Sequence, residues 1–159
     1  MSPSRRTILI ICHANTSRSA IAAALLERML AEHDLTDRYR ITSGGVAPFA
    51  RDGALVSLDA RLVLRDEGIH LPPDSVATDL KRNRHLVGEA DLILAMTDEQ
   101  VRMLRAGWPE AAGKPIHTLK EFAGVSGDID DPAGRDESVF AACRDEIKAC
   151  LARAVVRLA

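Results

Sequence analysis

Residues 7–12 read Thr-Ile-Leu-Ile-Ile-Cys, an almost unbroken apolar run rich in β-branched side chains. Such a run is typical of a strand that is covered on both faces, as in a parallel sheet. A polar loop follows, and residues 17–32 then carry apolar side chains at helical spacing, among them Ile21, Leu25 and Met29. This unit of strand, loop and helix predicts an α/β fold.

The rest of the chain continues the alternation of short apolar runs with longer amphipathic segments. We expect further strands at Tyr39–Thr42, Asp91–Met96 and Ile116–Leu119, and helices at 54–67, after a cap at Thr97, and at 138–158. Right-handed crossovers then give a four-stranded parallel sheet of order 2-1-3-4 with helices on both faces, a three-layer sandwich. Its ligand crevice is expected at the carboxyl end of the first strand.

Size and charge predict one domain and exclude two classes of partner. The 159 residues are expected to form a single domain over residues 1–159, since compact domains usually run about 100–200 residues. With 21 basic and 23 acidic residues the formal charge is −2, so we expect no nucleic acid and no membrane as partner. No apolar stretch reaches the ~20 residues that span a bilayer, and no targeting segment is evident, which predicts a cytoplasmic protein.

The three cysteines, Cys12, Cys143 and Cys150, include no Cys-x-x-Cys pair. This pattern argues against a disulfide framework and a structural zinc site, and the five histidines lack ligand spacing, so we expect no metal and no cofactor. Cys143 and Cys150 stand seven residues apart in the expected last helix, about 10.5 Å at 1.5 Å per residue. That separation is too long for a disulfide between them, and we interpret both as packing residues.

Residues 12–19, Cys-His-Ala-Asn-Thr-Ser-Arg-Ser, lie where the first strand ends and the first helix begins. Successive backbone N–H groups in such a loop, together with the helix N-terminus, favour a bound anion. The planar fork of Arg18 can hold two oxygens of a phosphoryl group. The same donors stabilise the thiolate of Cys12, which would attack phosphorus and form a phosphocysteine.

The other residues of this loop are expected to contribute to substrate binding. Asn15 tolerates positive φ, and its amide can brace neighbouring carbonyls. Ser19 either donates a hydrogen bond to the thiolate or caps the helix. His13 either faces solvent or helps to hold phosphate as a partly positive imidazole. The substrate-binding set is completed by Ala14, Thr16, Ser17 and Arg18.

The loop resembles the signature C-x-x-N-x-C/S-R-S of the low-molecular-weight protein tyrosine phosphatase family, which it matches in register at Cys12, Asn15, Arg18 and Ser19. Ser43-Gly44-Gly45 is similar to the family's S-A-G segment, and residues 90–96 resemble its third strand. The resemblance covers nearly the whole chain. It implies a cysteine-dependent phosphatase that acts on phosphorylated protein side chains and releases inorganic phosphate.

The resemblance also implies a general acid. Residues 128–134, Asp-Ile-Asp-Asp-Pro-Ala-Gly, are similar to the family's D-x-x-D-P-x-G segment ahead of the last helix, which places Asp131 in the acid position. A carboxylic acid there would protonate the leaving group and then activate water against the phosphoenzyme. Asp128 is the rival acid, and the family register favours Asp131.

Thr16 carries the prediction of the substrate. In phosphotyrosine enzymes of the family the corresponding position is typically a bulkier apolar residue, whereas in the protein arginine phosphatases it is Thr. Residues 43–46, 95–97 and 118–122 also resemble the arginine phosphatase branch. We therefore predict hydrolysis of phosphoarginine, with protein tyrosine phosphatase activity as the alternative.

The sequence also departs from the family pattern. Ser17 replaces the usual second cysteine of the loop, so an oxidised Cys12 lacks its disulfide partner. Phe49 aligns roughly with an aromatic wall position, although a core or loop-anchoring role fits equally well. Alanine stands at three positions where the family usually has another residue: Ala14 replaces a glycine, Ala20 a proline and Ala133 an aromatic residue. A phosphate-binding pseudoenzyme therefore remains open, as does arsenate reduction through Cys143 or Cys150.

Residues 81–85, Lys-Arg-Asn-Arg-His, form a short basic segment. No aromatic side chains interleave with these residues, so we interpret the segment as a solvent-exposed face rather than a nucleic-acid site. Recruitment of an acidic protein substrate is the alternative.

Overall fold

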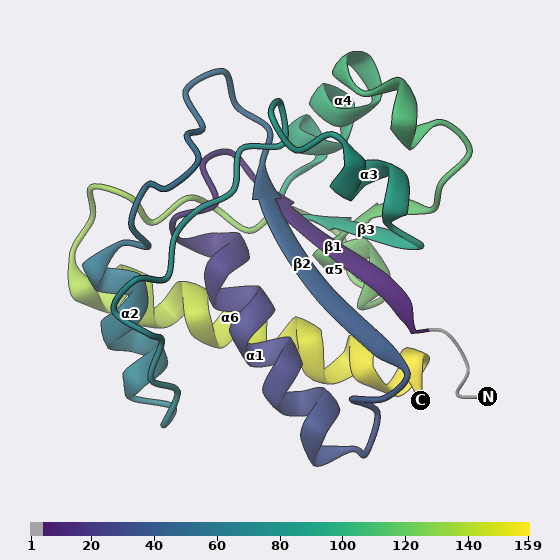
Figure 1. Ribbon diagram of the computed structural model, residues 1–159. Helices are drawn as coiled ribbons and strands as arrows, with labels where there is room; N and C mark the ends of the chain where they lie inside the picture. Colours follow the sequence, from purple (N-terminus) through teal and green to yellow (C-terminus); the bar gives the residue numbers. More distant parts are fainter. Residues whose placement is uncertain (1–4) are drawn as a thin grey trace.

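The computed structural model describes residues 5–159 and contains one parallel sheet (Figure 1). Its strands are β1 (Arg6–Cys12), β2 (Tyr39–Gly45), β3 (Leu92–Ala95) and β4 (Ile116–Thr118), in the order β2-β1-β3-β4. The predicted order 2-1-3-4 is confirmed.

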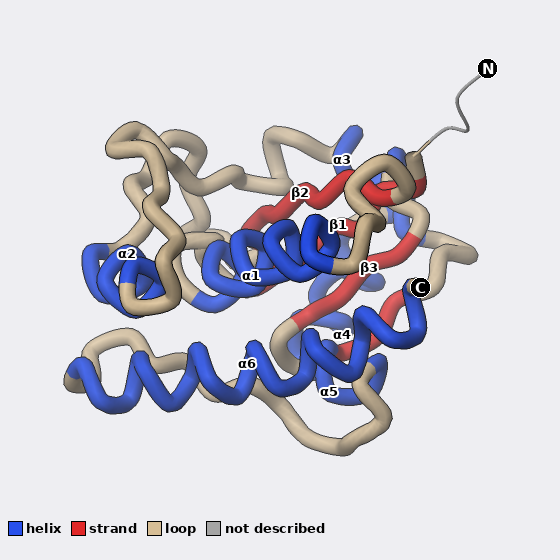
Figure 2. The backbone as a smooth tube through the Cα atoms, turned by 90° about the horizontal axis from the view of Figure 1, so that it is seen from below, coloured by secondary structure: helices blue, strands red, loops and turns tan. Residues whose placement is uncertain are grey.

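Helices cover both faces of this sheet, which confirms the predicted three-layer sandwich. One face is covered by α1 (Arg18–Glu32), α2 (Leu58–Arg65), α5 (Leu119–Phe122) and α6 (Glu137–Leu158). Figure 2 shows α1 and α6 running beneath the strands. The other face is covered by α3 (His85–Glu89), α4 (Asp98–Gly107) and the short 3-10 helix η1 (Pro109–Ala111).

Side-chain alternation along β1 divides the core between the two faces. Ile8, Ile10 and Cys12 pack into the larger cluster with α1 and α6, whereas Leu9 and Ile11 pack against the α3 and α4 side. All five side chains are buried, as expected for a central strand covered on both faces. Cys12 therefore ends the strand on the side of α1, where the loop to that helix begins.

The second strand extends three residues beyond the predicted end at Thr42. Gly44 and Gly45 continue the parallel pairing, opposite Ile11 and Cys12 of β1. A Cβ atom at Gly45 would lie 2.6 Å from the carbonyl oxygen of His13. Glycine at this position thus lets the end of β2 approach the loop that follows β1.

The predicted helix at 54–67 is shorter in the structure. Residues 54–56 are held in extended conformation by backbone hydrogen bonds to residues 75–77, and α2 begins only at Leu58. Ser57 is the N-cap, and its hydroxyl accepts a 3.2 Å hydrogen bond from the N–H of Ala60. Local propensity was overridden here by pairing with a distant loop. The short elements α3, α5 and η1 were not predicted.

The basic segment 81–85 lies at the surface, as the sequence predicts, with Lys81, Arg82 and His85 exposed. The segment also makes contacts that the sequence analysis did not predict, since Lys81 Nζ donates to the carbonyl oxygens of Ala47 at 2.7 Å and Ala50 at 3.3 Å. Arg84 forms a two-pronged ion pair with Glu110. Lys81 therefore fixes the loop that carries Phe49.

The last helix matches the prediction for residues 138–158 to within one residue. Cys143 and Cys150 are both buried on α6 among its core-facing residues, which confirms their interpretation as packing residues. Over residues 5–159, no helix is both long and apolar enough to cross a membrane.

Candidate active site

The loop between β1 and α1 surrounds the sulfur of Cys12. The side chain of Cys12 is 3% exposed, and its Sγ accepts a 3.2 Å hydrogen bond from the N–H of Asn15. The loop turns at Asn15, whose φ is 63°, a conformation that asparagine adopts more readily than most residues. The sulfur thus lies close to the N-terminus of α1, within hydrogen-bond distance of the backbone N–H of Asn15.

Asn15 and Ser19 form a hydrogen-bonded network with the sulfur of Cys12 on its buried side. Asn15 Oδ1 accepts from the N–H of Thr78 at 2.8 Å, which leaves its Nδ2 to donate to Ser19 Oγ at 2.7 Å. Ser19 Oγ lies 2.9 Å from Cys12 Sγ. Because a thiolate has no proton to give, the hydroxyl of Ser19 donates to the sulfur in that state. Of the two predicted roles of Ser19, the geometry favours this one over a helix cap.

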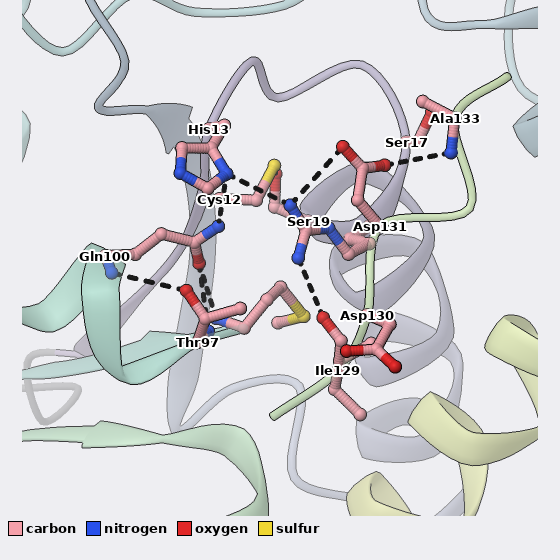
Figure 3. A network of polar contacts seen from close by, with 12 residues as sticks. Cys12, His13, Ser17, Ser19, Thr97, Gln100, Ile129, Asp130, Asp131 and Ala133 are labelled. Carbon is pink, nitrogen blue, oxygen red and sulfur yellow. Dashed lines mark hydrogen bonds and ion pairs between the residues drawn. The ribbon is translucent and has the colours of Figure 1, made fainter. Parts of the chain in front are cut away.

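Arg18 is buried at the base of the site, with 3% of its surface exposed. Its Nη1 donates to the carbonyl oxygen of Ile129 at 2.7 Å, and its Nη2 lies 3.2 Å from His13 Nδ1. Asp131 Oδ2 lies 3.7 Å from the same Nη2. These contacts, drawn in Figure 3, hold the guanidinium between the β1–α1 loop and the loop ahead of α6.

His13 is partly exposed and lines the cavity, and of its two predicted roles the geometry favours a contact inside the site over a ring that faces only solvent. Its Nδ1 lies 3.1 Å from Nε2 of Gln100 as well as close to Arg18 (Figure 3). Gln100 is fully buried at the first turn of α4, and the sequence analysis missed it. The only local signal at Gln100 is the capping-box pattern Thr97-x-x-Gln100 just after β3. That pattern accounts for a glutamine at this position as a cap, so it does not indicate the contact with His13.

Asp131 and its rival Asp128 occupy different environments. Asp131 is half exposed, and its Oδ1 accepts a 3.0 Å hydrogen bond from the N–H of Ala133, which orients the carboxyl group. Asp128 Oδ1 instead accepts from the N–H of Asp98 at the start of α4, at 2.9 Å. Asp128 is thus engaged at a helix N-terminus, whereas Asp131 lines the cavity beside Arg18.

A cavity of about 440 Å³ opens above the sulfur. Phe49 lines it although its side chain is 67% exposed, so this residue lies at the mouth and not in the core. Asn15 and Ser19, predicted as substrate-binding residues, are buried behind the sulfur and do not line the cavity. The lining residues are Cys12, His13, Ala14, Thr16, Ser17, Arg18, Phe49, Asp131 and Ala133.

Ser17, where the family pattern has a second cysteine, links the loop to α2. Its hydroxyl lies 3.0 Å from the hydroxyl of Ser57, the N-cap of that helix. The N–H of Ser57 also donates to the carbonyl oxygen of Thr16 at 2.9 Å. The loop is therefore fastened to α2 by hydrogen bonds at two successive residues.

The other two cysteines, Cys143 and Cys150, have raised thiol pKa values, which a nucleophilic cysteine does not have. Burial raises the pKa of Cys143 to about 11, and its Sγ faces the carbonyl oxygen of Asp130 at 3.9 Å. Burial also raises the pKa of Cys150. Both thiols are therefore poor sources of thiolate near neutral pH. Within the described residues 5–159, no three His, Cys, Asp or Glu side chains converge as metal ligands.

Comparison with known proteins gives concordant matches over almost the full length. Residues 7–159 match the family model described as low molecular weight phosphotyrosine protein phosphatase. A protein-arginine-phosphatase of Geobacillus stearothermophilus is 37% identical over 152 residues, covering 95% of each chain. The low molecular weight protein-tyrosine-phosphatase PtpB of Staphylococcus haemolyticus is 32% identical over 80% of this chain and 81% of its own.

A solved structure of the YwlE arginine phosphatase superimposes with a TM-score of 0.86 at 28% identity, covering 96% of this chain and 95% of that one. In that variant serine replaces the active-site cysteine, and the serine is phosphorylated.

Proposed function

The chain belongs to the low molecular weight phosphotyrosine protein phosphatase family, and from this premise we propose that it hydrolyses phosphoarginine in proteins through a phosphocysteine. One observation carries the proposal. Cys12 Sγ, Arg18 and Asp131 line a single cavity, so a nucleophile, an anion-binding guanidinium and a carboxyl group face the same space.

The first step transfers the phosphoryl group to Cys12. Its thiolate attacks phosphorus while Arg18 and the loop N–H groups hold the phosphoryl oxygens. The bond between phosphorus and the guanidinium nitrogen breaks, and that nitrogen takes its proton from the carboxyl group of Asp131. The products are S-phosphocysteine, a free arginine side chain and the carboxylate of Asp131.

The second step regenerates the enzyme. The carboxylate of Asp131 accepts a proton from water, whose oxygen attacks phosphorus as the bond to sulfur breaks. Inorganic phosphate leaves, and the electron pair of the broken bond returns to Cys12 as thiolate. The hydroxyl of Ser19, 2.9 Å from Sγ, stabilises that charge.

Four observations support a guanidinium leaving group. Thr16 lines the cavity and offers a short polar side chain there. Ala133 lines the cavity without offering an aromatic ring, and the carboxylate of Asp131 can pair with a cationic arginine product. The relative from Geobacillus stearothermophilus is itself named a protein-arginine-phosphatase.

Phosphotyrosine hydrolysis is the second candidate, favoured by one specific observation. The exposed ring of Phe49 lies at the cavity mouth, where it can stack against a phenol ring.

Turnover of p-nitrophenyl phosphate tests catalysis, and peptides carrying phosphoarginine or phosphotyrosine test the substrate. We expect activity that is lost in Cys12→Ser, with the higher kcat/KM on phosphoarginine. Thr16→Ile should shift the preference towards phosphotyrosine. Faster phosphotyrosine hydrolysis by the wild type would overturn the substrate assignment.

The same assays separate the remaining alternatives. Phosphate binding without turnover by the wild type would indicate a pseudoenzyme. Arsenate reduction would require Cys143 or Cys150, so Cys143→Ser and Cys150→Ser should leave phosphatase activity within about twofold of the wild type, because neither thiol lines the cavity.

A further inference from the structure

Two donors converge on one ring nitrogen of His13. Arg18 Nη2 lies 3.2 Å and Gln100 Nε2 lies 3.1 Å from His13 Nδ1 (Figure 3). A guanidinium carries only N–H donors and has no lone pair to offer. The Nδ1 atom therefore accepts from Arg18, which requires that it carry no proton.

The orientation of the Gln100 amide leads to the same conclusion. Its Oε1 accepts hydrogen bonds from the N–H groups of Met96 at 3.0 Å and Thr97 at 3.1 Å. Rotating the amide by 180° would set its NH2 group against both backbone donors in a fully buried position. The Nε2 group must therefore face His13, and it too can only donate.

We propose that His13 and Gln100 are positioning residues for Arg18, and that His13 performs this role as the neutral tautomer with its proton on Nε2. The backbone of Met96 and Thr97 orients Gln100, Gln100 orients the imidazole, and the imidazole accepts from the guanidinium. This inference rests on the proposed function in one respect, namely that Arg18 holds the phosphoryl group.

The arrangement leaves Arg18 free to bind phosphate. A guanidinium has five N–H groups, of which one on Nη1 is used by Ile129 and one on Nη2 by His13. The N–H on Nε and one on each Nη remain. Fixing the group in the empty site lowers the ordering cost of binding, since a long arginine side chain otherwise loses rotamer freedom when it engages the anion.

Protonation of His13 would reverse this role. A proton on Nδ1 would point at the N–H groups of Arg18 and Gln100, and the imidazolium charge would face the guanidinium. The other titratable groups near the ring are Glu99, whose Oε2 lies 3.9 Å from Nε2, Asp131 beyond Arg18, and Cys12 in the same loop. Acid is therefore expected to weaken phosphate binding through His13.

The first test measures inorganic phosphate binding by calorimetry and kcat/KM for p-nitrophenyl phosphate. His13→Leu keeps the bulk and removes the acceptor, and we expect both quantities to fall about tenfold, the effect of losing one hydrogen bond to a charged group. His13→Asn places an amide oxygen near the Nδ1 position and should remain within about threefold of the wild type. Gln100→Glu, which cannot donate to Nδ1, should resemble His13→Leu.

Arg102→Gln, an exposed change on the same helix α4, is the matched control and should change neither quantity. Both proteins share the titration of phosphate itself, so the ratio of their phosphate affinities isolates the effect of residue 13. We expect the ratio of phosphate affinity in His13→Asn to that in the wild type to rise as the pH falls, because asparagine cannot be protonated. Phosphate binding by His13→Leu that equals the wild type overturns the proposal, and so does an affinity ratio of His13→Asn to wild type that falls as the pH falls.

The second test needs no activity. Nitrogen NMR of the wild type labelled at histidine, with His13 assigned by its disappearance in His13→Asn, reports which ring nitrogen carries the proton. We expect Nε2 protonated and Nδ1 bare at neutral pH, and a proton on Nδ1 contradicts the proposal. If the protein hydrolyses neither p-nitrophenyl phosphate nor phosphoarginine peptides, the proposed function fails while this result still decides the state of His13.

Discussion

The carbonyl oxygen of Ile129 accepts a 2.7 Å hydrogen bond from Arg18 Nη1, although the two residues lie 111 positions apart in the sequence. The N–H of Ile129 donates at 2.9 Å to the carbonyl oxygen of Met96, just after β3. Ile129 is thus fixed through both backbone groups, and Asp131 follows two residues later. The contact with Ile129 therefore links Arg18, the proposed phosphate-binding residue, to the segment that carries Asp131, the proposed general acid.

Replacing Arg18 with lysine tests this coupling. One ammonium group cannot contact the phosphoryl oxygens, Ile129 and His13 together, because it lacks the planar fork of a guanidinium. We expect Arg18→Lys to lower kcat/KM by about 10²–10³-fold, as for the loss of one transition-state donor. Unfolding in urea should show a stability loss of about 1–3 kcal/mol from the unpaired carbonyl of Ile129. Unchanged stability would mean that the contact with Ile129 contributes little.

Ser19 is predicted to act mainly on the second chemical step. In Ser19→Ala the thiolate leaving group of the phosphocysteine loses its 2.9 Å hydrogen bond, so hydrolysis of the intermediate should slow by about 10–100-fold. Rapid-quench measurements should then show a burst of p-nitrophenol and a trapped phosphoenzyme. Equal slowing of the burst and of the steady state would instead place the effect of Ser19 before the intermediate.

Asp131 and Asp128 form a matched pair for the acid assignment. Asp131→Asn should lower kcat by about 10²-fold or more on phosphoarginine peptides and less on p-nitrophenyl phosphate, whose leaving group needs little protonation. Asp128→Asn retains an oxygen that can accept from the N–H of Asp98, and it should keep near wild-type kcat on both substrates. The reverse result would transfer the acid role to Asp128.

Local sequence pattern predicted the parts of this fold that local physics controls. The apolar run of β1, the Asn15 turn and the position of Arg18 all follow from neighbouring residues, and the structure places them as expected. The inward turn of His13 was not predictable, because its partner Gln100 lies 87 positions away. The capping box at the start of α4 already accounts for a glutamine at position 100, so nothing in this segment indicates that Gln100 belongs to the candidate active site.

The same reasoning explains the error at α2 and the unpredicted contacts of Lys81. Residues 54–56 pair with residues 75–77, and Lys81 reaches the loop around Phe49. Both contacts depend on how two loops meet in space, which no helical or strand periodicity encodes.

Glu67 is predicted to make stability depend on pH. It follows α2 and pairs with Lys148 of α6 at 2.9 Å and with Arg28 of α1 at 3.3 Å. The hydrogen bond from Lys148 is the main cause that lowers the pKa of Glu67, against burial, which raises it. Because the folded pKa lies below the unfolded one, this stabilisation is present above the unfolded pKa of about 4.3 and is lost as the pH falls through the folded pKa.

Glu67→Gln should therefore lower the free energy of unfolding by about 1–2 kcal/mol near pH 7, since the side chain is 17% exposed and its cations lose their shared partner. Urea titrations at several pH values should show this difference shrinking as the pH falls below the unfolded pKa of about 4.3 and vanishing below the folded pKa, where the wild-type carboxylate is itself protonated. Glu32→Gln is the control, because Glu32 is 64% exposed and contacts Arg28 only at 3.8 Å, so its removal should cost less than about 0.5 kcal/mol. A pH-independent loss in Glu67→Gln would assign its effect to packing and not to charge.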